Sequence, residues 1–89
     1  MKVEYLPSFI KDLKSLKGSP AYKRIRVLTF EQIPACESWN EIRNLKKLKT
    51  EDSAYRIRVG DYRIGLFFEN ETITFARVRH RKEIYRVFP

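Results

Sequence analysis

Hydrophobic residues recur at helical spacing through the first third of the chain. Residues 2–6 alternate between polar and apolar and predict a short opening strand. A first helix is expected from Ser8, its candidate N-cap, to Gly18, which supplies the stop. A second helix is expected to begin at Ser19-Pro20, because proline is well tolerated in the first helical turn, and to end near residue 33. The short break between the helices predicts a helical hairpin, with apolar positions at Phe9, Leu13, Leu16, Tyr22, Ile25, Leu28 and Ile33.

The second half of the chain changes to a period of two, which is typical of β-strands. Apolar residues alternate with arginine and other residues over 55–59 and again over 62–69, and Gly60-Asp61 stands between them as a two-residue hairpin turn. Asn70-Glu71 marks a second turn before a strand over about 72–79. We therefore expect an antiparallel meander of three strands.

The segment from residue 34 to residue 45 is less clearly patterned. Ile42, Leu45 and Leu48 fit either a helix or the approach to a strand, and the pattern leaves both open.

The first hairpin turn predicts which arginines share a face of the sheet. With Gly60-Asp61 as the turn, Arg58 lies directly opposite Arg63, and Arg56 lies two residues further along the same face. Like charges placed directly across a strand pair are destabilising, so we expect this face to hold an anion such as phosphate. The alternative is a solvent-exposed face whose arginine stems cover apolar surface.

The second turn predicts the position of the last strand. With Asn70-Glu71 as the turn, Arg63 faces Val78, and His80 lies diagonal to Arg63 on the arginine side. Arg79 then falls on the opposite, apolar face unless a β-bulge intervenes. That apolar face is expected to pack against the helical hairpin.

The composition narrows the partners that such a surface can have. Lys and Arg number 19 against 11 Asp and Glu, a net charge of +8, which attracts nucleic acid, an anionic membrane or an acidic protein. One cysteine, Cys36, cannot form an internal disulfide, and no signal peptide or membrane-spanning stretch is apparent, so we expect a cytoplasmic protein. One histidine and one cysteine provide no transition-metal site, and we expect no cofactor. A length of 89 residues fits a single domain over 1–89.

Two further features favour RNA over a free phosphate. Lys46, Lys47 and Lys49 form a basic run suited to following a nucleic-acid backbone, although a solvated turn has the same composition. Tyr85, close behind the basic tail, offers a ring for base stacking and a hydroxyl for proton transfer, although it could also pack into the core.

Four segments together resemble the RelE/ParE superfamily of toxins. These are YRIRVGDYRIG over residues 55–65, the tail VRHRKEIYRVF, the preceding NLKKLK and the early FIKDLKSL. The resemblance implies an α+β fold with an N-terminal strand, a two-helix hairpin on a curved antiparallel sheet, and a short C-terminal helix or tail. Such a fold is related in shape to small microbial ribonucleases.

The resemblance also implies roles for particular residues. Arg63 matches the arginine that stabilises the scissile phosphate and its transition state. Arg56 and Arg58 match basic residues that contact phosphate, although arginine is a poor general base. Tyr85 matches the tyrosine that stacks on or orients the target nucleotide. The C-terminal catalytic basic position could be either of Arg79 and Arg81, and His80 stands where related toxins often place a catalytic histidine.

Members similar to RelE cut mRNA in the ribosomal A site and are neutralised by a cognate antitoxin. The resemblance therefore implies a metal-independent endoribonuclease whose partners are mRNA, the ribosome and an antitoxin protein. ParE-like members instead inhibit DNA gyrase, and a non-catalytic relative that binds RNA or protein is a third reading.

Overall fold

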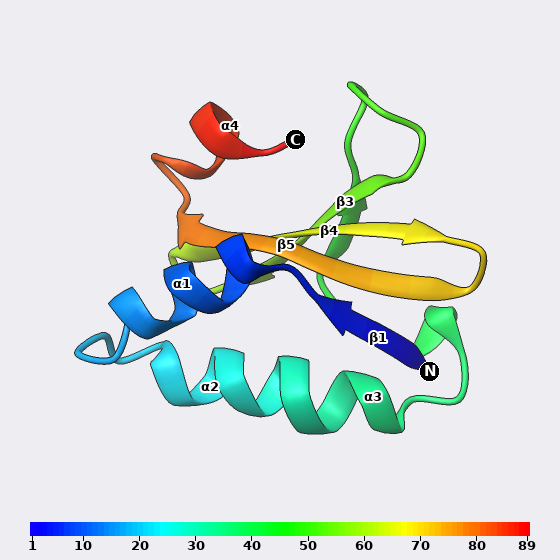
Figure 1. The fold of residues 1–89 in the computed structure, drawn as a ribbon, viewed down its shortest axis with the longest axis horizontal. Coiled ribbons are helices and arrows are strands. Elements are labelled where there is room, and N and C mark those ends of the chain that lie inside the picture. The colour runs from blue at the N-terminus through cyan, green and yellow to red at the C-terminus, as the bar shows by residue number, and fades with distance from the viewer.

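A computed structural model describes residues 1–89 and places five strands in one mixed sheet of order β1-β5-β4-β3-β2 (Figure 1). β1 runs parallel to β5, and the other neighbours are antiparallel. The opening strand and the three-strand meander are confirmed. The sheet is mixed rather than purely antiparallel, and it gains a short fifth strand. The strands are β1 Lys2–Tyr5, β2 Leu45–Lys47, β3 Ala54–Val59, β4 Tyr62–Glu69 and β5 Thr72–His80.

The predicted helical hairpin is present, and its second arm is one continuous helical rod. α1 spans Pro7–Ser15, and the rod consists of α2 Tyr22–Val27, a π-helical turn η1 Leu28–Gln32, and α3 Ile33–Ala35. Pro34 in α3 cannot donate a backbone hydrogen bond and crowds the carbonyl four residues earlier, and the wider π-helical turn accommodates this crowding. None of the helices is long and apolar enough to cross a membrane.

The predicted N-cap at Ser8 is wrong. α1 begins at Pro7 with Leu6 as its N-cap, because proline is favoured at the first helical position. The Ser8 hydroxyl instead donates a hydrogen bond to the Ala76 carbonyl at 2.6 Å. α1 is therefore bonded directly to β5.

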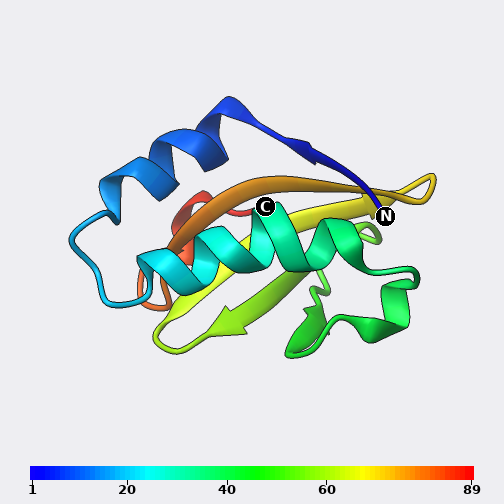
Figure 2. The same ribbon diagram turned by 90° about the horizontal axis from the view of Figure 1, so that it is seen from below.

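The main core lies between the sheet and the helical hairpin. Figure 2 shows the α2–α3 rod crossing one face of the sheet, with α1 alongside it near the β1 edge. The buried residues come from both layers, as the alternation predicted: Phe9, Leu13, Ile25, Ile33, Ile57, Val59, Ile64, Leu66, Ile73, Phe75 and Val78.

The segment that the pattern left open closes one end of this core. After α3 the chain forms a short 3₁₀ helix, η2 Trp39–Glu41, fixed by a capping box between Ser38 and Glu41. The Trp39 ring stacks on Phe68 with centroids 3.9 Å apart. The chain then enters β2, so the later part of this segment is a strand approach.

A second, smaller core covers part of the opposite face of the sheet. The C-terminal helix α4 Ile84–Val87 lies there, on the side away from α1 and the rod (Figure 1). Ile84 and Phe88 are buried against Ala54 and Ala76. A Cβ atom at Gly65 would lie 2.5 Å from Cγ of Phe88, so only glycine leaves room for this ring.

A β-bulge at Ala76 changes the register predicted for β5. Leu66 pairs with Phe75 but Gly65 pairs with Arg77, so Ala76 is an extra residue on β5. Arg63 consequently pairs with Arg79 and not with Val78, and His80 pairs with Tyr62. The expectation that His80 shares a face with Arg63 is therefore wrong, and the bulge turns Arg79 toward that face instead.

Candidate functional site

The sheet face that carries α4 also carries two adjacent rows of basic side chains. Residues paired across strands point to the same face, so one row is Arg58, Arg63 and Arg79 on β3, β4 and β5. The predicted opposition of Arg58 and Arg63 is confirmed. The second row contains Lys46, Arg56 and Arg77, with Gly65 between the two arginines. We call these two rows the arginine face.

Three arginines of this face have no carboxylate partner. Arg56, Arg58 and Arg63 form no ion pair, although each is charged at neutral pH. Arg56 donates through Nη1 to the Asn44 carbonyl at 3.0 Å, which fixes its guanidinium at the β2 end of the face. Forked donors that lack a carboxylate partner have the chemistry of a phosphate site.

Arg63 is the central member of the face. Its Nη1 donates to the carbonyls of Gly60 and Tyr62, both at 2.9 Å, so the side chain is held beside the hairpin turn. Desolvation by burial, followed by the positive charge of Arg56, lowers the pKa of Arg63 from its usual value. A bound anion would relieve both effects.

Tyr85 stands next to this cluster on α4. Its phenol acts against the lowering of the Arg63 pKa, and 58% of the residue is exposed. Packing of Ile84 and Phe88 fixes α4 on the sheet, so the ring of Tyr85 is presented to solvent and not buried in the core. The expected alternative of core packing is wrong for this residue.

The other residues of the basic tail have separate positions. The positive charge of Arg81 contributes to lowering the pKa of Arg63, and Arg81 Nε lies 3.9 Å from Asp61 Oδ1. His80 lies on the helix side, edge-on to Tyr62 with centroids 5.6 Å apart, and its Nδ1 accepts from the Lys82 amide at 3.1 Å. The structure therefore brings Arg81 to the site and separates His80 from it.

The lysine run does not lie on one surface. Lys46 pairs with Arg56 and belongs to the arginine face. Lys47 pairs with Tyr55 on the opposite face and lies 3.9 Å from Asp52. Lys49 follows the end of β2 and is exposed.

Asp12 is a residue that the sequence pattern missed. It sits among lysines on α1, a pattern typical of a solvated helix face, yet it is only 4% exposed. It forms ion pairs with Arg77 at 2.7 Å and with Arg79 at 3.1 Å. No pattern in the sequence indicated Asp12, but the bulge beside it had a readable signal, because apolar residues of β5 move from Phe75 to Val78, a spacing of three.

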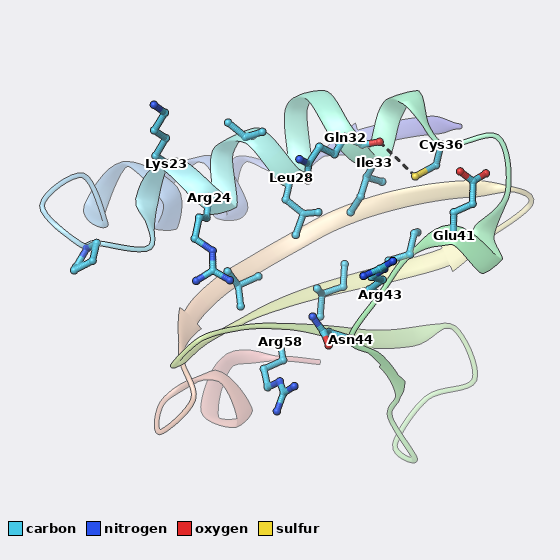
Figure 3. Close-up of a pocket in the computed structure, with 15 residues that line it drawn as sticks. Lys23, Arg24, Leu28, Gln32, Ile33, Cys36, Glu41, Arg43, Asn44 and Arg58 are labelled. Carbon is cyan, nitrogen blue, oxygen red and sulfur yellow. Dashed lines mark hydrogen bonds between the residues drawn. The ribbon is translucent and has the colours of Figure 1, made fainter.

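A groove of about 710 Å³ lies on the other side of the sheet, between the α2–α3 rod and the loop before β2 (Figure 3). Its apolar lining includes Val27, Leu28, Ile33 and Ile42. Lys23, Arg24 and Arg43 line it as well. Arg58 belongs to this lining as well, although Figure 3 shows its side chain pointing away from the α2–α3 rod.

Comparison with protein families places the whole chain among toxins. The model of a family described as the ParE toxin of the type II toxin–antitoxin system parDE matches residues 3–85. Toxin RelE3 of Methanocaldococcus jannaschii is 44% identical over 90 residues, which cover all of both chains.

Solved structures agree with this relationship. The chain resembles the toxin in a RelB–RelE antitoxin–toxin complex from Methanococcus jannaschii, with 43% identity, a TM-score of 0.78 and coverage of 97% of this chain and 99% of that one. A RelE–RelB complex from Pyrococcus horikoshii matches with 25% identity, a TM-score of 0.59 and coverage of 90% and 93%.

Proposed function

Because this chain belongs to the RelE/ParE superfamily of toxins from type II toxin–antitoxin systems, we propose that it is an endoribonuclease that cleaves mRNA in the ribosomal A site. The observation that carries the proposal is the arginine face, where Arg58 and Arg63 stand opposite each other without a carboxylate. The exposed ring of Tyr85 beside them adds a stacking surface for a base. Such a protein would act in the cytoplasm, where ribosomes translate mRNA.

The chemistry requires no metal ion in this proposal. The 2′-hydroxyl of the RNA attacks the adjacent phosphorus, the bond from phosphorus to the 5′-oxygen breaks, and the products are a 2′,3′-cyclic phosphate and a 5′-hydroxyl. Arg63 stabilises the charge that develops on the phosphoryl oxygens, and Arg56 and Arg58 add to this field. Arg79 and Arg81, at the end of β5, are the candidates for contact with the leaving group.

One proton leaves the 2′-hydroxyl and one reaches the 5′-oxygen. Arginine is already protonated at neutral pH and cannot accept the first proton, so Tyr85 is our candidate for assisting proton movement. His80 remains a candidate from the family resemblance, but its place on the helix side would require the RNA or the tail to move before it could take part.

Cleavage of a translated mRNA by the purified protein, with and without ribosomes, tests the proposal. We expect cuts that need ribosomes, and Arg63→Ala should slow them by about 100-fold or more because an oriented donor to the transition state is lost. Tyr85→Phe tests the hydroxyl. Arg26→Ala, an exposed arginine on α2, is the matched control and should cut normally. Unchanged cutting by a folded Arg63→Ala protein would contradict the proposal.

Inhibition of DNA gyrase is the second candidate function, and the match to a family described for ParE favours it. A supercoiling assay with the same preparation distinguishes the two. If the protein inhibits supercoiling and leaves translated mRNA intact, gyrase is the target. RNA binding without cleavage or gyrase inhibition would indicate a non-catalytic relative.

We also propose that a cognate antitoxin binds this chain. The Methanococcus and Pyrococcus relatives are toxins crystallised with an antitoxin. The groove beside the α2–α3 rod, with its apolar lining and its basic residues, is suited to an amphipathic segment that carries acidic side chains. The arginine face and this groove would then serve different partners.

A further inference from the structure

The edge of β5 changes partner halfway along its length. β1 pairs with β5 only as far as Phe75, so the outer edge of β5 beyond that residue has no strand beside it. Two side chains of α1, one helical turn apart, bond this edge instead. Ser8 donates to the Ala76 carbonyl at 2.6 Å, and the Val78 amide donates to Asp12 Oδ2 at 3.2 Å. Where β1 no longer pairs with β5, side chains of α1 therefore satisfy the backbone groups of the β5 edge.

Asp12 has a second set of bonds that Ser8 lacks. Arg77 donates to it through Nε at 2.7 Å and through Nη2 at 3.2 Å, and Arg79 donates through Nε at 3.1 Å. With the Val78 amide, the carboxylate accepts four hydrogen bonds and is saturated. Because the buried carboxylate uses all of its acceptor sites, its orientation is fixed, and the groups that donate to it are held in place.

The bond to Arg79 uses only Nε. Both terminal nitrogens of Arg79 therefore keep donor hydrogens, and Nη1 has only a loose contact with Glu83, at 3.9 Å. Arg79 stands directly opposite Arg63. Asp12 thereby fixes the Arg79 guanidinium at the outer edge of β5 and leaves its terminal nitrogens available to an anion.

We propose that Asp12 is a positioning residue, which holds the Arg79 guanidinium in the orientation needed to bind an RNA phosphate at the arginine face. This rests on the proposed function for the cleavage readout, but the orientation itself can be observed without cleavage. A purely structural Asp12 would stabilise the fold and leave the intrinsic rate unaffected.

The first test compares single-turnover cleavage by Asp12→Asn, Arg79→Ala and the double variant, with rates corrected for the folded fraction. We expect each single variant to slow cleavage by roughly 10- to 100-fold, and the double variant to be no slower than Arg79→Ala. Ser8→Ala loses an edge bond of the same helix without touching an arginine, and it should cut at the wild-type rate. If the rate losses of the two single variants multiply in the double variant, the proposal is overturned.

The second test follows the Nε–H resonances of Arg77 and Arg79 by NMR. A 2′-O-methyl RNA oligonucleotide, which cannot be cleaved, is the ligand. We expect the oligonucleotide to shift the Arg79 resonance in the wild-type protein and to leave it unshifted in Asp12→Asn. The same shift in both proteins would overturn the proposal. If wild-type protein shows the Asp12-dependent shift but never cuts, the ribonuclease proposal fails and the positioning role stands.

If Asp12→Asn does not fold, Arg79→Lys tests the positioning role of Asp12. A lysine ammonium that pairs with Asp12 has no outer fork left for phosphate. We expect its cleavage rate to match that of Arg79→Ala, and cleavage at the wild-type rate would overturn the proposal.

Discussion

On the arginine face, the residue at position 65 is constrained by the C-terminal helix α4, which packs against it. Gly65 separates Arg56 from Arg77 in the second row and accepts the ring of Phe88 against its backbone. Phe88 in turn holds α4, and α4 presents Tyr85. Because Gly65 has no side chain, Phe88 can pack against it, and this packing determines where the Tyr85 ring lies.

Gly65→Ala should lower the free energy of unfolding by about 1–3 kcal/mol, because the added methyl overlaps the Phe88 ring in a packed core. Urea denaturation measures the loss. Gly18→Ala is the matched control, since a Cβ there meets nothing within 4 Å, and it should leave stability nearly unchanged. If Phe88→Ala in the Gly65→Ala background fails to reduce the penalty, the overlap is not its cause.

At the scale of elements, the bulge in β5 is what assembles the candidate site. The helices, the two hairpin turns and the Arg58–Arg63 pair followed from periodicity and turn chemistry in the sequence, because those signals are local. The Arg63–Arg79 pair did not follow from these signals, because a single extra residue in β5 reverses which of its side chains face the helices. Asp12 could not be placed at all, since its burial depends on where β1 ends beside β5.

β2 offers a test of which face meets RNA. Lys46 and Lys47 are adjacent in sequence, but only Lys46 is on the arginine face. Lys46→Ala should weaken binding of single-stranded RNA and reduce the slope of log K against log salt by about 0.7, the contribution of one phosphate contact. Lys47→Ala should leave the slope unchanged. Fluorescence anisotropy over a range of NaCl concentrations measures both, and equal slopes for the two variants would place the RNA elsewhere.

At the scale of the whole molecule, basic side chains line two different surfaces, the arginine face and the groove along the α2–α3 rod. The arginine face contains three arginines without a carboxylate partner, which suits phosphate. The groove along the α2–α3 rod combines basic side chains with an apolar lining, which suits a protein segment. Charge alone did not distinguish these surfaces in the sequence.

Arg24→Glu should weaken the complex with a cognate antitoxin by roughly tenfold, because it reverses a charge beside the groove. Isothermal titration with the cognate antitoxin proposed above measures the affinity. Arg26→Glu, on the same helix and outside the groove lining, is the control and should bind normally. Equal losses in both variants would indicate a general effect of charge and not a docking site.

The parallel pairing of β1 with β5 joins the two ends of the chain and has a consequence for biosynthesis. Contacts between distant segments form late, because a long loop must close before they contribute. On a translating ribosome, α1 and the rod emerge long before the strand that they cover, and Asp12 emerges long before Val78 and Arg79. A nascent chain therefore lacks both the closed sheet and the ordered arginine face. The contacts that order Arg79 therefore cannot form until β5 has been synthesised and has left the ribosome.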